Sequence, residues 1–121
     1  ERMVNIMNIQ ECYQEMGGNY QDVIGRLGSE AFVEKFARRF LDDKSFQMIK
    51  DGIETQDAEL AFRGAHTLKG VCMNLGFQTL YEVSRELTEI LRGRELVGYE
   101  EALEKVQEQY DRTIGAIQKL G

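Results

Sequence analysis

His66 is the only histidine among the 121 residues, and a lysine and a glycine follow it at positions 69 and 70. A neutral imidazole is a nucleophile near pH 7 and can attack phosphorus without a separate base. Lys69, one helical turn on, offers a positive charge to phosphoryl oxygens. Gly70 costs a helix about 1 kcal/mol relative to alanine, and we expect its missing side chain to leave room beside the imidazole. These three residues predict a site that carries a phosphoryl group.

A helix over about 57–75, begun by a capping oxygen of Thr55 to Asp57, places this site on its outer side. One apolar stripe of the helix is expected to face the core and consists of Ala61, Ala65, Leu68, Cys72 and Leu75. At roughly 100° per residue, His66 lies about 140° from the centre of this stripe, so its imidazole is predicted to face solvent. Gly64 lies near the stripe and is interpreted as a glycine that permits close helix packing.

Apolar residues on the same outer face indicate a surface that another protein covers. Phe62 lies one turn before His66, and Met73 lies two turns after it, where a monomer normally places charged residues. Arg63 is on the same face. We therefore expect Phe62, Arg63 and Met73 to bind a partner.

The rest of the chain predicts an all-α domain. Proline is absent, and glycines separate stretches with apolar residues at three-and-four spacing. Helical segments are expected over about 6–27, 29–40, 57–75, 80–91 and 103–117, with a further turn or two around 46–53 after a break at Asp42-Asp43. The face of the first segment consists of Ile6, Ile9, Tyr13 and Met16. We expect one domain over 1–121: an antiparallel four-helix bundle over about 29–119, with the short N-terminal helices over 6–27 packed against it.

Composition excludes several classes of function. The net charge of −6 disfavours nucleic acid and anionic membranes, and no apolar run is long enough to cross a bilayer. Cys12 and Cys72 have neither a metal-binding spacing nor the number of a disulfide framework, so a reducing, cytoplasmic setting fits. No phosphate-binding loop or magnesium-binding carboxylate cluster is visible, and no metal site is expected. Kinase activity of its own with ATP is therefore not expected, and a monomer is the default.

The segment from Ala65 to Gly76 resembles the signature of histidine-containing phosphotransfer (HPt) domains of two-component phosphorelays. The matching residues are Ala65, His66, Leu68, Lys69, Gly70, Asn74, Leu75 and Gly76. The helix start at Asp57 and the segment 86–93 are similar too, so the resemblance covers roughly 28–93 and extends to the ends only in helical character.

The resemblance implies a four-helix bundle in which His66 accepts a phosphoryl group on its distal ring nitrogen. The donor would be the aspartyl phosphate of a receiver domain, in a response regulator or hybrid histidine kinase, and the acceptor another receiver. Lys69 would steady the phosphate charge, Gly70 would leave room for phosphohistidine and the receiver's loops, and magnesium would belong to the receiver. Where many members carry a glutamine that hydrogen-bonds near the imidazole, this chain has Thr88, whose reach is shorter.

Two alternatives stay open from the residues. One is a helical adaptor that docks on receivers or kinases without being phosphorylated, although an adaptor has no need for Gly70 beside a histidine. The other is the substrate domain of a larger histidine kinase. A freestanding protein is the simpler expectation if Met3 is the natural first residue.

Overall fold

A computed structural model describes residues 6–121 of the chain, so Met3 lies outside the described residues. Its elements are α1 (Ile9–Met16), α2 (Tyr20–Leu27), α3 (Glu30–Arg39), the 3₁₀ turn η1 (Phe40–Asp42), α4 (Ser45–Glu54), α5 (Ala58–Leu75), α6 (Gln78–Leu91) and α7 (Glu100–Ile117). No strand occurs between residues 6 and 121, and the predicted all-α class is confirmed. No helix in this range is both long and apolar enough to span a membrane.

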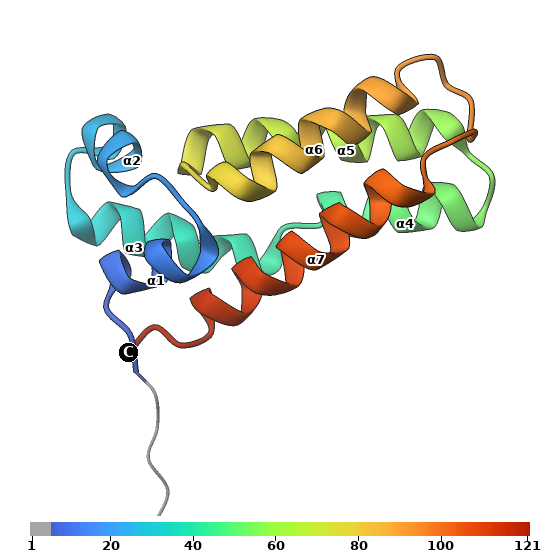
Figure 1. Ribbon diagram of the computed structural model, residues 1–121. Coiled ribbons are helices and arrows are strands. Elements are labelled where there is room, and N and C mark those ends of the chain that lie inside the picture. The colour runs from blue at the N-terminus through green and yellow to red at the C-terminus, as the bar shows by residue number, and fades with distance from the viewer. Residues whose placement is uncertain (1–5) are drawn as a thin grey trace, which may run out of the picture.

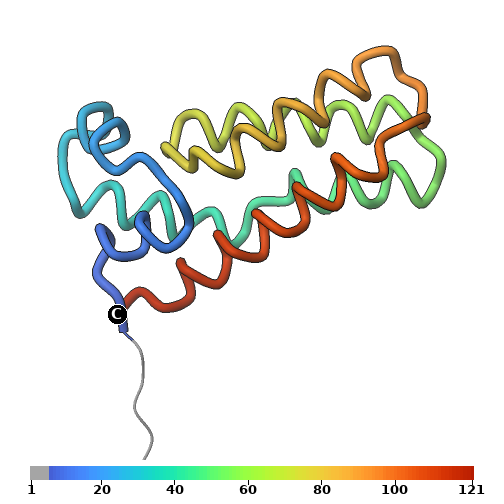
Figure 2. Tube along the Cα trace, viewed as in Figure 1, coloured from blue at the N-terminus to red at the C-terminus, as the bar shows by residue number. Residues whose placement is uncertain are grey.

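α3 and α4 are roughly collinear and are separated by a short break in the helix (Figure 2). The helix tightens into η1 after Arg39, and Asp43 has an extended backbone with ψ of 135°. The Asp43 carboxylate then accepts a hydrogen bond of 2.8 Å from the backbone N–H of Ser45, the first residue of α4. The predicted break at Asp42-Asp43 is confirmed, but the helix after it has ten residues rather than a turn or two.

α4 and α5 approach each other closely because glycines face the contact. A Cβ atom on Gly52 of α4 would lie 2.4 Å from the backbone nitrogen of Ala61, and one on Gly64 of α5 would lie 2.8 Å from that of Ile49. No side chain fits between the helices at these points. The interpretation of Gly64 as a packing glycine is confirmed, and Gly52 is its counterpart on α4.

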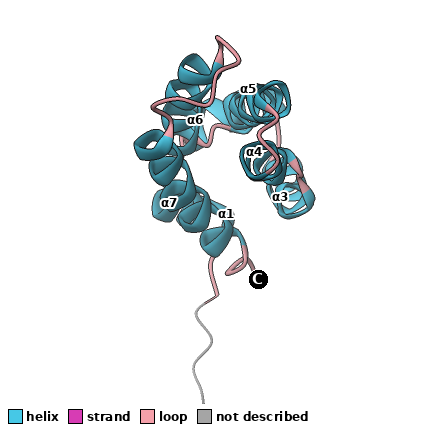
Figure 3. Cartoon of the chain, turned by 90° about the vertical axis from the view of Figure 1, so that its right-hand side faces the viewer, coloured by secondary structure: helices cyan, strands magenta, loops and turns pink. Residues whose placement is uncertain are grey.

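The helices α4, α5, α6 and α7 lie side by side in chain order, and successive helices run in opposite directions (Figure 1). In the view turned by 90°, α5 lies beside α6, with α4 and α7 on the two flanks (Figure 3). Gly76 ends α5 in the left-handed conformation, with φ of 69°, and allows the chain to reverse into α6. Buried aromatic rings pack in the core between the helices. Phe40 and Phe77, for example, lie edge to face with centroids 5.1 Å apart.

The N-terminal segment packs against one end of these helices. α1 contacts α7, α2 contacts α3, and the hydroxyl of Tyr13 donates a hydrogen bond of 2.6 Å to the carbonyl oxygen of Leu75. The prediction that Ile6 belongs to the buried face of the first helix is wrong, because Ile6 precedes α1 and its side chain is 64% exposed. The side chain of Asn8 caps the helix at Glu11, so the helix begins at Ile9.

Candidate functional site

The site lies on α5, whose ends are fixed by capping groups. The Asp57 carboxylate accepts a hydrogen bond of 3.0 Å from the backbone N–H of Leu60, and the backbone N–H groups after the helix bond to the carbonyls of its last turn. His66 therefore lies near the middle of a regular helix of 18 residues. A rigid element thus presents the imidazole.

The prediction that α5 has a buried apolar side and an exposed side with His66 is confirmed. The stripe residues Ala61, Ala65, Leu68 and Cys72 are fully buried, Leu75 is half-buried, and His66 is exposed. Lys69 and Gly70 are partly exposed on the same side as His66. A Cβ atom on Gly70 would meet no side chain and no backbone of another element within 4 Å. Helix packing therefore does not explain Gly70, and the space beside it is open.

The predicted exposure of Phe62 is wrong. Its side chain is only 7% exposed, because the chain after α6 folds over it. The guanidinium of Arg94 lies 3.8 Å from the centre of the Phe62 ring, and that of Arg92 lies at 5.5 Å. The Phe62 ring still contacts the site, because it is stacked against the imidazole of His66, with centroids 5.8 Å apart and planes inclined by 21°. Phe62 supports His66 rather than offering a surface to a partner.

Met73 and Arg63 are on the surface, as predicted. Met73 is 50% exposed, an unusually open position for a large apolar side chain. The Arg63 side chain is 60% exposed and lies 4.0 Å from the Glu59 carboxylate, a loose ion pair in solvent. Both side chains are free to meet a partner beside His66.

The prediction that Thr88 lies at the partner surface is also wrong. Thr88 is fully buried, and its hydroxyl donates a hydrogen bond of 2.7 Å to the carbonyl oxygen of Ser84, one turn earlier in α6. A turn of 100° per residue brings its neighbour Glu89 to the exposed face instead. The position chosen by counting residues along the sequence thus falls on the inner side of α6.

Glu89 lies among positive charges that the sequence analysis did not single out. Its carboxylate accepts hydrogen bonds of 2.7 and 3.1 Å from Arg92. That bonding, together with the charges of Arg92, Lys69 and Arg85, lowers the pKa of Glu89 below its usual value. We call Lys69, Arg85 and Arg92 the cation cluster. The spacing of Arg85, Glu89 and Arg92 places them on one face of a helix and is a signal that sequence reasoning could have used.

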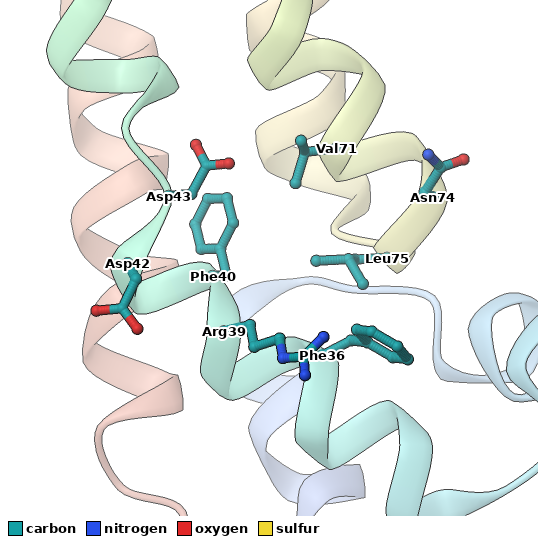
Figure 4. A pocket seen from close by; sticks show the side chains of 8 residues that line it. All are labelled: Phe36, Arg39, Phe40, Asp42, Asp43, Val71, Asn74 and Leu75. Atoms are coloured by element: carbon teal, nitrogen blue, oxygen red, sulfur yellow. The ribbon is translucent and has the colours of Figure 1, made fainter.

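A separate pocket of about 320 Å³ lies between α3 and the C-terminal half of α5. In Figure 4, Leu75 extends from the end of α5 toward the segment that carries Phe40, and Val71 lies above Leu75. The remaining lining residues are Phe36, Arg39, Asp42, Asp43 and Asn74. The pocket contains none of the predicted site residues, but Asn74 follows the exposed Met73 directly in the chain.

Fold and site together define an all-helical domain that presents an exposed histidine beside a partly exposed lysine and an open space at Gly70. The family model of the Hpt domain matches residues 31–116, which is more than half of the chain. The chain therefore belongs to the Hpt domain family, which has a phosphotransfer role in two-component signalling and interacts with receiver domains. Comparisons with curated proteins and with solved structures found no match.

Proposed function

We propose that the protein is a phosphorelay intermediate that takes a phosphoryl group from one receiver domain and passes it to another, with His66 as its carrier. The observation that carries the proposal is the exposure of this histidine beside the open space at Gly70. The packing of α4, α5, α6 and α7 in alternating directions also supports a four-helix bundle as the scaffold of the site.

The proposed reaction is a direct displacement at phosphorus. The lone pair of the distal ring nitrogen forms the N–P bond while the bond from phosphorus to the receiver's aspartate oxygen breaks, and the aspartate leaves as a carboxylate. The second transfer runs the same step in reverse onto another receiver's aspartate. Lys69 offsets the charge of the phosphoryl oxygens, and Gly70 leaves room for the group and the receiver's loops. Magnesium is expected in the receiver's acidic pocket rather than in this chain.

A receiver is proposed to dock around His66. Arg63 and the cation cluster suit an acidic pocket, because opposite charges accelerate encounter and fix its orientation. Met73, which is exposed on the same face of α5 as His66, offers an apolar contact beside the imidazole. We also propose that the protein is a monomer in the cytoplasm. The free, buried thiols of Cys12 and Cys72 suit a reducing compartment.

The test is transfer of labelled phosphate from a phosphorylated receiver domain to the purified protein. We expect label that is lost in acid and stable in alkali, as is usual for a phosphorus–nitrogen bond. The matched variant is His66→Gln, which keeps a polar side chain of similar size. Label on the His66→Gln protein would exclude His66 as the carrier.

A further inference from the structure

Within the part of the chain that the structure describes, no hydrogen bond sets the orientation of the His66 imidazole. Between residues 6 and 121, no hydrogen bond joins a ring nitrogen of His66 to another residue, and the Thr88 hydroxyl is engaged by the Ser84 carbonyl. The aromatic contact of the imidazole is the ring of Phe62, stacked at 5.8 Å. Whatever holds Phe62 in place therefore also limits how the imidazole can turn.

Arg94, in the connection between α6 and α7, holds the ring of Phe62. Its guanidinium lies 3.8 Å from the ring centre, the distance of a close cation–π contact. The same guanidinium donates hydrogen bonds of 3.0 Å to the Glu59 carboxylate and 2.7 Å to the carbonyl oxygen of Arg92. Glu59 is on α5, one turn before Phe62. Arg94 thus links the end of α6 to the first half of α5 directly over the ring.

The backbone of Arg94 supports a specific role for its side chain. Its φ is 56°, in the left-handed region that glycine adopts without strain and other residues adopt at a cost. The backbone N–H of Arg94 donates a hydrogen bond of 2.9 Å to the carbonyl oxygen of Leu91 and closes the turn that follows α6. A glycine would satisfy this backbone better than arginine does. A non-glycine residue persists in this conformation only where its surroundings hold it there, and the contacts of the Arg94 side chain with Phe62 and Glu59 do so here.

We propose that Arg94 is a positioning residue for phosphoryl transfer. It clamps Phe62, and the Phe62 ring in turn restricts the His66 imidazole to an orientation suited to the reaction. This inference rests on the proposed function, since it concerns the rate at which His66 reacts. Arg94 acts through Phe62 and through its ion pair with Glu59.

The size of the effect follows from the freedom that the imidazole would gain. On a helix, two χ1 rotamers are readily available to most side chains, and χ2 of histidine has about two orientations. When Phe62 no longer restricts the imidazole and all four orientations are equally populated, the ring is in the reactive orientation for about a quarter of the time. Loss of the clamp should therefore slow phosphoryl transfer about fourfold.

The test is Arg94→Gly, which removes the side chain and relieves the backbone. We expect transfer to His66 to slow about fourfold, and the nuclear Overhauser contact between the Phe62 and His66 rings to weaken, while the melting temperature stays equal or rises. The control is Gln56→Gly, because Gln56 is exposed and its φ of 59° is nearly that of Arg94. The control variant should transfer phosphate at the wild-type rate.

A double variant separates positioning from a direct effect of the Arg94 charge. Phe62→Leu keeps an apolar side chain but removes the aromatic ring, so adding Arg94→Gly should slow transfer no further. A further loss in the double variant, or an Arg94→Gly protein with unchanged ring contact and rate, would overturn the proposal. If the wild-type protein accepts no phosphate, the proposed function fails, and the ring contact alone then decides whether Arg94 positions His66.

Discussion

Gly64 of α5 lies so close to α4 that a Cβ atom on it would come within 2.8 Å of the backbone nitrogen of Ile49. Six residues later on the same helix, Gly70 faces open space. The two glycines weaken the helix equally as isolated residues, but only the first is required by packing. A substitution at Gly64 therefore tests the packing of the domain, and a substitution at Gly70 tests access to His66.

Gly64→Ala should destabilise the domain by about 1–3 kcal/mol, because the added methyl group has to separate α4 from α5. Urea unfolding followed by circular dichroism measures the change. Gly70→Ala is the matched control and should raise stability by up to about 1 kcal/mol through helix propensity. Equal effects of the two substitutions would contradict the packing contact.

Gly70→Gln should slow phosphoryl transfer about tenfold, because a long side chain would occupy the space beside the imidazole and displace the incoming group. The fold should be intact or slightly more stable. The rate is measured by single-turnover transfer from a phosphorylated receiver domain. Unchanged transfer would show that steric clearance is not the reason for this glycine.

Met73→Asp should weaken receiver binding about tenfold in a titration, since it places a carboxylate in an apolar contact. Its melting temperature should change little, because the side chain is 50% exposed. Phe62→Asp is the contrasting variant: it buries a charge at a site that is 7% exposed and should cost about 3 kcal/mol or more in stability. Wild-type binding by Met73→Asp would remove Met73 from the docking surface.

Lys69 and Glu89 should affect the reaction in opposite directions. Lys69→Gln removes the cation beside the phosphoryl group and should slow transfer about tenfold. Glu89→Gln removes a carboxylate from among the cation cluster and should speed transfer about twofold, with less gain at high salt. Rates at two salt concentrations check both expectations. A slower Glu89→Gln protein would mean that this carboxylate assists the imidazole instead of competing for Lys69.

The buried thiols should be unreactive in the folded protein. Burial, aided by the charge of Glu15, raises the pKa of Cys12 to about 12, and burial also raises the pKa of Cys72. Because unfolded thiols ionise near pH 8.5 and the folded ones stay protonated, stability is retained below about pH 8.5 and falls as pH rises from there toward 12. A thiol reagent at pH 8 should label both cysteines in urea and neither without it. Rapid labelling of the folded protein would contradict the burial of both thiols.

The sequence by itself determined most of the helices and the outward direction of His66. Capping at Asp57, the left-handed glycine at position 76 and the apolar stripe all act within one helix, so local rules suffice. The same rules distinguished Gly64 from Gly70, since the angle around the helix decides which glycine faces a neighbour. The HPt resemblance is local in the same sense, because its matching residues lie within one helix and its end.

Only the tertiary structure decided what surrounds the histidine. Phe62 is on the outer half of α5, but the connection after α6 brings Arg92 and Arg94 over its ring, and no pattern along the sequence specifies where a loop folds back. Thr88 is buried and Glu89 is exposed because the rotation of α6 against α5 is set by side-chain packing. A difference of one residue is 100° on a helix, so the partners of His66 depended on how the helices pack, whereas its own direction depended on one helix alone.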